Sequence, residues 1–207
     1  MSIFVALNEH DYGQAFEVGW ARCHASHQAG HKHAYASDHL TQKEIVAYNA
    51  QAVAAEMAVA DWLGLGDRIW QPHVNSFKRE PDVPPYWEVK HSRYESAQFM
   101  PIHDNDRDTD MAIFVRGFPI MEIVGYLPVV DCKKPEYRSN AFGRGWFYKV
   151  PIDQLHPVKP VKTAINEFDE VEMVDEKDVI MRCVSCGCWI MAPLTMCRTC
   201  TSWRLPQ

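Results

Sequence analysis

The sequence predicts an α/β protein in which two N-terminal helices precede a mixed sheet and a small C-terminal zinc ribbon. Residues 9–63 carry helical periodicity and capping signals, and residues 69–158 carry β-rich runs bounded by glycine, proline and charged turns. Five of the seven cysteines lie in the last 25 residues. A chain of 207 residues with a hydrophobic fraction of 47% can form one medium domain with a real core. We therefore expect a main domain over 1–158, an acidic linker over 159–178 and a zinc ribbon over 179–207.

The helical part divides near residues 29–39, where the run AGHKHAYASDH interrupts the periodicity. Thr41 is the predicted N-cap of the second helix, with Glu44 as its capping-box partner. Gly64 is predicted to end this helix, because glycine accepts the left-handed conformation that closes many helices.

The second helix carries a charge where an apolar residue is expected. Its apolar stripe consists of Ile45, Ala52, Val59 and Leu63, and Glu56 falls in the middle of that stripe. An ionised carboxylate facing a core costs free energy unless it is paired or bound to a metal. Two interpretations stay open: Glu56 forms a salt bridge with an inward Lys or Arg, or it is a catalytic carboxylate that faces the following sheet.

Residues 122–130 and 145–151 are predicted strands, and the short run 86–90 is another. Alternate residues of a strand point to the same face. Glu88 and Lys90 are therefore expected to share one face of their strand, opposite to the apolar residues beside them. Such a pattern is typical either of a solvated edge or of a site that holds a metal ion and a water molecule.

Glu56, the dipeptide PD at 81–82 and the run EVK at 88–90 together resemble the signature of the PD-(D/E)xK nuclease superfamily. The stretch AAEMAVADWLGL at 54–65 is similar to the helix before the signature in small phage-encoded members. The runs IVGYLPV and YKVPIDQLHPV extend the resemblance over residues 45–157. It implies a restriction-endonuclease-like mixed sheet flanked by helices, and a metal-dependent DNA endonuclease or exonuclease, phage-encoded and acting in the host cytoplasm.

The resemblance also assigns roles to particular residues. Asp82, Glu88 and Glu56 are expected to bind Mg²⁺ or Mn²⁺, with the backbone carbonyl of Val89 as a further oxygen ligand, because these hard ions take oxygen ligands. Lys90 is expected to orient or deprotonate the attacking water and to offset negative charge. The predicted catalytic residues are therefore Glu56, Asp82, Glu88 and Lys90.

One local feature departs from a regular hairpin. Pro84 and Pro85 lie between Asp82 and Glu88, and proline interrupts the hydrogen bonds of a strand ladder. Asp82 is therefore expected to reach the site from a turn or an edge, and Glu80 is the alternative carboxylate.

The C-terminal cysteines form two pairs, CVSC at 183–186 and CRTC at 197–200. Two CxxC knuckles supply four thiolates for tetrahedral Zn²⁺, so we expect a closed structural site made by Cys183, Cys186, Cys197 and Cys200. Cys188 is a nearby competitor, although its spacing suits a knuckle less well. Disulfides are the alternative, which an intracellular protein disfavours.

The net charge and the distribution of apolar residues limit the classes of partner that the protein can bind. The net charge of −6 argues against a broadly basic nucleic-acid coat but leaves room for a local basic groove that binds DNA. The candidate clusters either line such a groove or merely balance surface acids; they are Lys78 with Arg79, Lys90 with Arg93, Lys133 and Lys134 with Arg138, and Arg144 with Lys149. We see no signal peptide and no run of about 20 apolar residues, so we expect a cytoplasmic protein with no membrane partner. Two other functions stay open: a non-catalytic nucleic-acid-binding accessory protein, and a phage factor whose ribbon engages a host or phage protein.

Two further patterns are weaker. His24, His27 and His31 recur at helical spacing, and with His33 they form a cluster that either binds a metal or is a plain surface segment. The run HDNDRDTD at 103–110 begins like a calcium loop but lacks the glycine and terminal glutamate of an EF-hand, so we interpret it as a solvated turn between strands.

Overall fold

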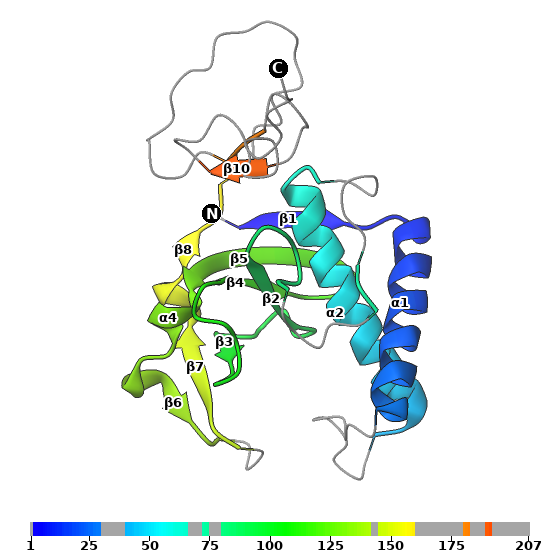
Figure 1. Cartoon of the computed structure of the whole chain (residues 1–207), viewed down its shortest axis with the longest axis horizontal. Helices are drawn as coiled ribbons and strands as arrows, with labels where there is room; N and C mark the ends of the chain where they lie inside the picture. The colour runs from blue at the N-terminus through cyan, green and yellow to red at the C-terminus, as the bar shows by residue number, and fades with distance from the viewer. Residues whose placement is uncertain are drawn as a thin grey trace, which may run out of the picture. The chain divides into compact units, whose positions relative to one another are not determined.

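The computed structural model describes residues 2–29, 40–65, 72–74, 80–141, 145–159, 180–182 and 189–191. The chain divides into two compact units, Met1–Thr163 and Ala164–Gln207. The first unit is a mixed α/β structure (Figure 1). None of the helices in the described ranges is long and apolar enough to cross a membrane.

The first unit begins with the short strand β1 (Ile3–Ala6), which is followed by two long helices. Helix α1 (Glu9–Gln28) starts at a capping box formed by Asn8 and Asp11. Helix α2 (Gln42–Trp62) starts at Thr41, whose side chain accepts from the backbone N–H of Glu44 and whose own N–H donates to the Glu44 carboxylate. The predicted capping box of α2 is therefore confirmed.

The predicted end of α2 is confirmed as well. Gly64 follows the C-cap residue Leu63 and has a φ of 68°, in the left-handed region that favours glycine. Its N–H donates to the carbonyl of Asp61, and the N–H of Leu65 donates to the carbonyl of Ala60. These bonds satisfy carbonyl groups that the last turn of the helix leaves open.

Helices α1 and α2 lie side by side (Figure 1), and one glycine sets how closely they approach. A Cβ atom at Gly19 would lie 2.5 Å from the backbone nitrogen of Ala50 in α2. Only a residue without a side chain permits this backbone-to-backbone contact.

The described strands of the first unit form two sheets. The larger sheet has the order β1-β5-β4-β2, with β8 also paired to β5, and the smaller has the order β3-β7-β6. Strand β2 runs parallel to β4, while the other neighbours are antiparallel, so the larger sheet is mixed. The bounds are β2 (Trp87–Ser92), β3 (Phe99–Ile102), β4 (Met111–Arg116), β5 (Ile120–Pro128), β6 (Arg138–Ser139), β7 (Phe147–Pro151) and β8 (His156–Pro157). The described residues of this unit also form three short helices, α4 (Val129–Cys132), η1 (Pro135–Tyr137) and η2 (Ile152–Gln154).

The predicted strands are present with adjusted ends. The run predicted over 122–130 is β5, except that its last two residues begin α4 after Pro128. The N–H of Val129 leaves the ladder and donates to the carbonyl of Asp110. The run predicted over 145–151 is β7, and the run over 86–90 is β2.

The larger sheet has a helix on one face and the smaller sheet on the other. On the helix face, the indole of Trp62 in α2 packs edge-on against that of Trp87 in β2, with 5.8 Å between ring centroids. On the opposite face, Ala112 and Phe114 of β4 enter a buried cluster with residues of β3 and β7. That cluster comprises Met100, Ile102, Ala112, Phe114, Leu127, Val129, Cys132, Tyr148, Val150 and Leu155.

Within the second unit, the described residues form an antiparallel pair, β9 (Ile180–Arg182) and β10 (Trp189–Met191). Residues 183–188, which connect these strands in the chain, lie outside the described ranges, as do residues 192–207. The linker predicted over 159–178 lies outside them too, except for Lys159.

Candidate functional site

Glu88 and Lys90 lie on one face of β2, as the sequence predicts. The Lys90 ammonium donates to Oε1 of Glu88 across 2.8 Å. Paired strand residues point to the same side of a sheet, and the partners of Glu88 and Lys90 in β4 are Ala112 and Phe114. The charged pair therefore lies on the face that the smaller sheet covers, and both side chains are almost buried.

Asp82 reaches β2 from the turn that precedes it. The chain reverses at Pro84 and Pro85, and Val83 and Trp87 exchange two backbone hydrogen bonds of 3.0 and 2.9 Å. This reversal brings Oδ2 of Asp82 to 2.9 Å from the backbone nitrogen of Val89. The side chain of Asp82 thus contacts the ExK run directly.

The backbone of β2 places one more oxygen at this edge. In a strand, the N–H and C=O of one residue point to the same edge, and residues two apart share that edge. Both backbone groups of Trp87 face Val83, on the side of β2 away from β4. The carbonyl of Val89 consequently points to the same edge as the Asp82 carboxylate.

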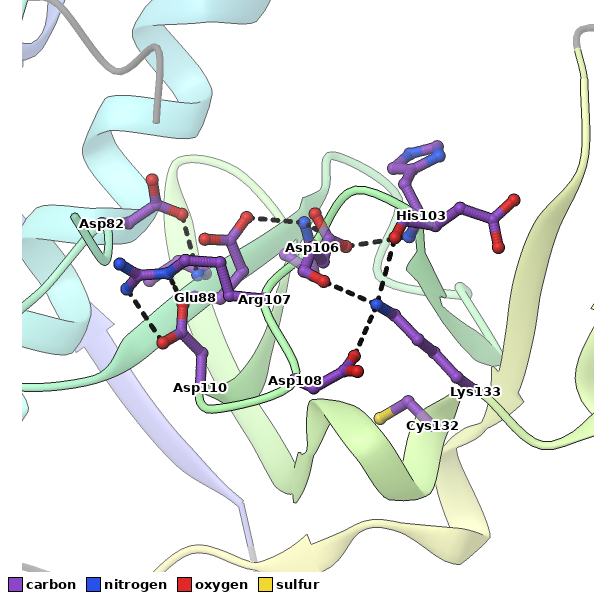
Figure 2. Close-up of polar contacts among 12 residues, drawn as sticks. Asp82, Glu88, His103, Asp106, Arg107, Asp108, Asp110, Cys132 and Lys133 are labelled. Atoms are coloured by element: carbon purple, nitrogen blue, oxygen red, sulfur yellow. Dashed lines mark hydrogen bonds and ion pairs between the residues drawn. The ribbon is translucent and has the colours of Figure 1, made fainter. Parts of the chain in front are cut away.

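Asp106, from the run HDNDRDTD, also belongs to this cluster. Its Oδ2 lies 2.8 Å from the Lys90 ammonium, and its side chain is only 8% exposed. Figure 2 shows how the loop between β3 and β4 brings Asp106 beside Glu88. Lys90 therefore lies between two carboxylates, one from its own strand and one from this loop.

The loop itself is held by several polar contacts (Figure 2). Lys133, at the end of α4, donates to the carbonyl of Asp106 across 2.6 Å and to the side chain of Asp108 across 2.7 Å. Arg107 forms a bidentate ion pair with Asp110, with both distances 2.8 Å. Asp110 is only 3% exposed, so the interpretation of 103–110 as a solvated turn is wrong for two of its carboxylates, although the segment does connect two strands.

The charges around Lys90 favour its ammonium form. Burial lowers the pKa of Lys90, but the carboxylates of Glu88 and Asp106 outweigh it and hold that pKa above its ordinary value. Burial and the nearby Lys90 charge lower the pKa of His103, which starts the same loop. At neutral pH the cluster thus contains a charged lysine and, beside it, a histidine that favours its neutral form.

Glu56 is buried, and both of its carboxylate oxygens accept hydrogen bonds from Arg22 of α1. The Nη1–Oε1 distance is 2.6 Å and the Nη2–Oε2 distance is 2.8 Å. This is the salt-bridge interpretation that the sequence left open. In this arrangement a guanidinium, supplied by the neighbouring helix, neutralises Glu56.

The guanidinium of Arg22 interacts electrostatically both with Glu56 of α2 and with Asp82 at the edge of β2. Burial lowers the pKa of Arg22, but the hydrogen bonds and charge of Glu56 and the charge of Asp82 raise it overall. The charge of Asp82 therefore acts on the same guanidinium that binds Glu56. Glu56 itself is on α2, which packs over the face of β2 that carries Trp87, opposite to Glu88 and Lys90.

Oxygen donors for a hard cation are present, but they are not gathered into a cage of side chains. Within the described ranges, no three His, Cys, Asp or Glu residues are grouped closely enough to hold a metal ion. The donors around β2 are instead the Asp82 carboxylate and the Val89 carbonyl at its edge, and the Glu88 carboxylate on its face beside Lys90. Their chemistry suits Mg²⁺ or Mn²⁺, which take oxygen ligands and retain water.

Other predicted site residues have different outcomes. His24 stacks on Trp20 in α1, with 5.5 Å between centroids, and lines a small pocket with His27 and Gln42. His31 and His33 lie outside the described residues, and so do the four predicted zinc ligands Cys183, Cys186, Cys197 and Cys200. Glu80, the alternative to Asp82, is exposed.

Comparison with known proteins adds no family to this geometry. No protein-family model, curated protein or solved structure matches the chain. The residues of the site are therefore the basis for its function.

Proposed function

We propose that this protein is a metal-dependent DNA nuclease that hydrolyses phosphodiester bonds. The observation that carries the proposal is the arrangement at β2, where Lys90 is held on the same strand face as Glu88 while Asp82 binds the backbone between them. This arrangement and the PD…EVK motif agree with a restriction-endonuclease-like core.

Phosphodiester hydrolysis needs an oriented water molecule and positive charge near the phosphate. Asp82, Glu88 and the Val89 carbonyl would hold Mg²⁺ or Mn²⁺, which supplies Lewis-acid chemistry when bound. Lys90 supplies a positive charge from the protein itself, in addition to that of the metal ion. Because its pKa is held above the ordinary value, Lys90 acts as a cation that orients water and offsets phosphate charge rather than as a free base.

Glu56 is proposed as a further carboxylate of the site, with Arg22 as its partner. The pair is buried, and the charge of Asp82 is one of the causes that raise the pKa of Arg22. In this role the Arg22–Glu56 ion pair supplies fixed charges that act on the Asp82 carboxylate. Glu56 could bind the metal directly only if Arg22 gave up its hydrogen bond to one of the two Glu56 carboxylate oxygens.

The smaller sheet offers cations for a nucleic-acid backbone. The guanidinium of Arg138 lies over the ring of Trp146, and the ammonium of Lys149 lies over the ring of Phe99. Lys149 and Trp146 are exposed, and no described carboxylate forms an ion pair with Lys149. Exposed cations among aromatic rings are typical of surfaces that bind nucleic acid by phosphate contacts and stacking.

We also infer that the C-terminal cysteines form a structural zinc ribbon, in a phage-encoded protein that works in the host cytoplasm. The support is positional: β9 ends at Arg182, directly before the first CxxC pair, and β10 ends before the second. A ribbon at this place would add a contact for DNA or for a host or phage protein.

A second function is favoured by the same ion pairs. Lys90 is neutralised by two carboxylates and Glu56 by Arg22, an arrangement that also suits a buried structural cluster. In that case the protein is a non-catalytic nucleic-acid-binding accessory protein on a nuclease-like fold. A protein-interaction factor is the remaining alternative.

A paired cleavage and binding experiment separates these functions. Wild type, Lys90→Ala and the control Lys43→Ala, an exposed lysine of α2, are incubated with plasmid and linear DNA in Mg²⁺ or Mn²⁺. Each is also titrated with DNA at fixed salt. Loss of the Lys90 amine should reduce cleavage by roughly 10²–10⁴-fold, and it should change affinity by only a few-fold because one lysine makes one phosphate-like contact.

Glu88→Ala serves as a second variant, because it also removes a proposed metal ligand and its residual cleavage should respond to raised Mg²⁺. Binding without cleavage by the wild type selects the accessory protein. Absence of both selects the interaction factor.

A further inference from the structure

We propose that Asp106 is a positioning residue of the candidate site, which fixes the Lys90 ammonium from a loop outside the PD…EVK motif. The proposal has two halves. The positional half, that Asp106 holds Lys90 in place, concerns only contacts within this chain. The catalytic half, that this placement is needed for cleavage, deepens the proposed nuclease function and rests on it.

The first ground is the geometry of the Asp106 carboxylate. Its Oδ2 accepts the backbone N–H of His103 across 2.8 Å and lies 2.8 Å from the Lys90 ammonium. The backbone N–H of Asp106 in turn donates to the carbonyl of His103. The carboxylate is therefore fixed within its own loop before it meets Lys90, and both side chains of the pair are nearly buried.

The second ground is that the loop is anchored independently of Lys90. Lys133 binds the carbonyl groups of Asp104 and Asp106 and the side chain of Asp108. Arg107 and Asp110 close the other end of the loop, where β4 begins. A carboxylate on such a support keeps its place when its partner moves, which is what a positioning residue requires.

The third ground is the number of carboxylates that balance the Lys90 ammonium. Lys90 is nearly buried and has two carboxylate partners, of which Glu88 is also a proposed metal ligand. A carboxylate that shares its charge with a cation is a weaker partner for an ammonium. Asp106 supplies a second counter-charge, so Lys90 remains held in place when Glu88 is engaged elsewhere.

The test measures the accessibility of Lys90 directly, in metal-free buffer. Folded wild type, Asp106→Asn and Asp106→Glu are pulsed with an amine-acetylating reagent, and modification of Lys90 is followed by peptide mass spectrometry. Exposed Lys43 is the internal reference. Glu122→Gln is the matched control, since it removes a carboxylate of similar exposure that pairs with Arg116 rather than with Lys90.

Loss of a charge-assisted hydrogen bond should raise modification of Lys90 in Asp106→Asn by about tenfold relative to Lys43. Asp106→Glu, which retains the charge, should lie closer to wild type, and Glu122→Gln should match wild type. Unchanged protection of Lys90 in Asp106→Asn, or equal loss in Glu122→Gln, overturns the proposal.

The catalytic half is read from cleavage kinetics. Asp106→Asn should lower kcat by about 10²-fold with little change in KM, because it misplaces Lys90 and leaves DNA binding intact. A rise in KM at constant kcat contradicts this half. If wild type cuts no DNA, the proposed nuclease function and the catalytic half fail together, whereas the acetylation result still decides whether Asp106 positions Lys90.

Discussion

Arg22 in α1 and Glu56 in α2 form a buried bidentate ion pair, with nitrogen–oxygen distances of 2.6 and 2.8 Å. The side chains are 11% and 6% exposed, so neither charge has water as an adequate alternative partner. The pair joins the two helices at the point where the α2 stripe would otherwise be apolar.

The energetic role of this pair can be tested by removing one or both charges. Arg22→Met alone should lower the free energy of unfolding by about 3–5 kcal/mol, because it leaves the Glu56 carboxylate buried and unpaired. The double variant Arg22→Met with Glu56→Leu should recover most of that loss, since well-packed apolar residues often replace buried pairs at no cost. Urea denaturation of the wild type, both single variants and the double variant gives the coupling energy. A double variant as unstable as the sum of the singles contradicts the pairing.

The close contact of α1 and α2 at Gly19 predicts a steric effect. Gly19→Ala should destabilise the protein by about 1–3 kcal/mol, because its Cβ would lie 2.5 Å from the backbone nitrogen of Ala50. Gly13→Ala is the control on the same helix: a Cβ there meets nothing within 4 Å. That exposed substitution should stabilise α1 by about 0.5–1 kcal/mol through helix propensity. Thermal unfolding of the two variants measures the contrast, and equal shifts would falsify the packing explanation.

A buried thiol predicts a loss of stability at high pH. Burial, reinforced by Asp131 and Asp106, raises the pKa of Cys132 from 9.0 to about 12. The folded state thus holds the thiol proton more tightly than the unfolded state does. The stability from this difference is fully present below pH 9, and it is lost as pH rises towards 12.

The measurement is the unfolding free energy of wild type and Cys132→Ala between pH 7 and pH 11. The variant should be less stable than wild type at pH 7, because a buried side chain has been shortened. The gap between them should narrow above pH 9, since only the wild type has this thiol. A constant gap over the whole range would show that the thiol titrates normally.

The paired cysteines of the tail predict a bound metal. Purified protein should contain about one zinc per chain, with zinc–sulfur distances near ~2.3 Å. Cys197→Ser should lose zinc, whereas Cys23→Ser, which replaces a cysteine buried in α1, should retain it. Elemental analysis and X-ray absorption measure both quantities. A disulfide between Cys183 and Cys200 in mass spectrometry contradicts the prediction.

Local signals determined what the sequence could predict. The capping box of Thr41 and Glu44 and the glycine at position 64 act within one turn of helix, and the structure confirms them. The shared face of Glu88 and Lys90 follows from the two-residue period of a strand, and it is confirmed as well.

Long-range partners could not be predicted in the same way. The sequence required a partner for Glu56 but could not select Arg22, which is 34 positions away on another helix. Asp106 lies in a run of polar residues that has no apolar periodicity, so nothing local distinguishes it from its exposed neighbour Asp108. Its contact with Lys90 depends on how the β3–β4 loop folds back over β2, which is a property of the tertiary structure.

The reversal at Val83 also protects the molecule from other copies of itself. Strand β2 is an edge strand in the described part of the larger sheet, and edge strands readily pair with strands of other molecules. Here the backbone groups of Trp87 are taken by Val83, and the N–H of Val89 is taken by Asp82. The aspartate that faces the candidate catalytic edge thereby also blocks part of the strand against intermolecular pairing, because its loss would free the N–H of Val89 for a strand of another molecule.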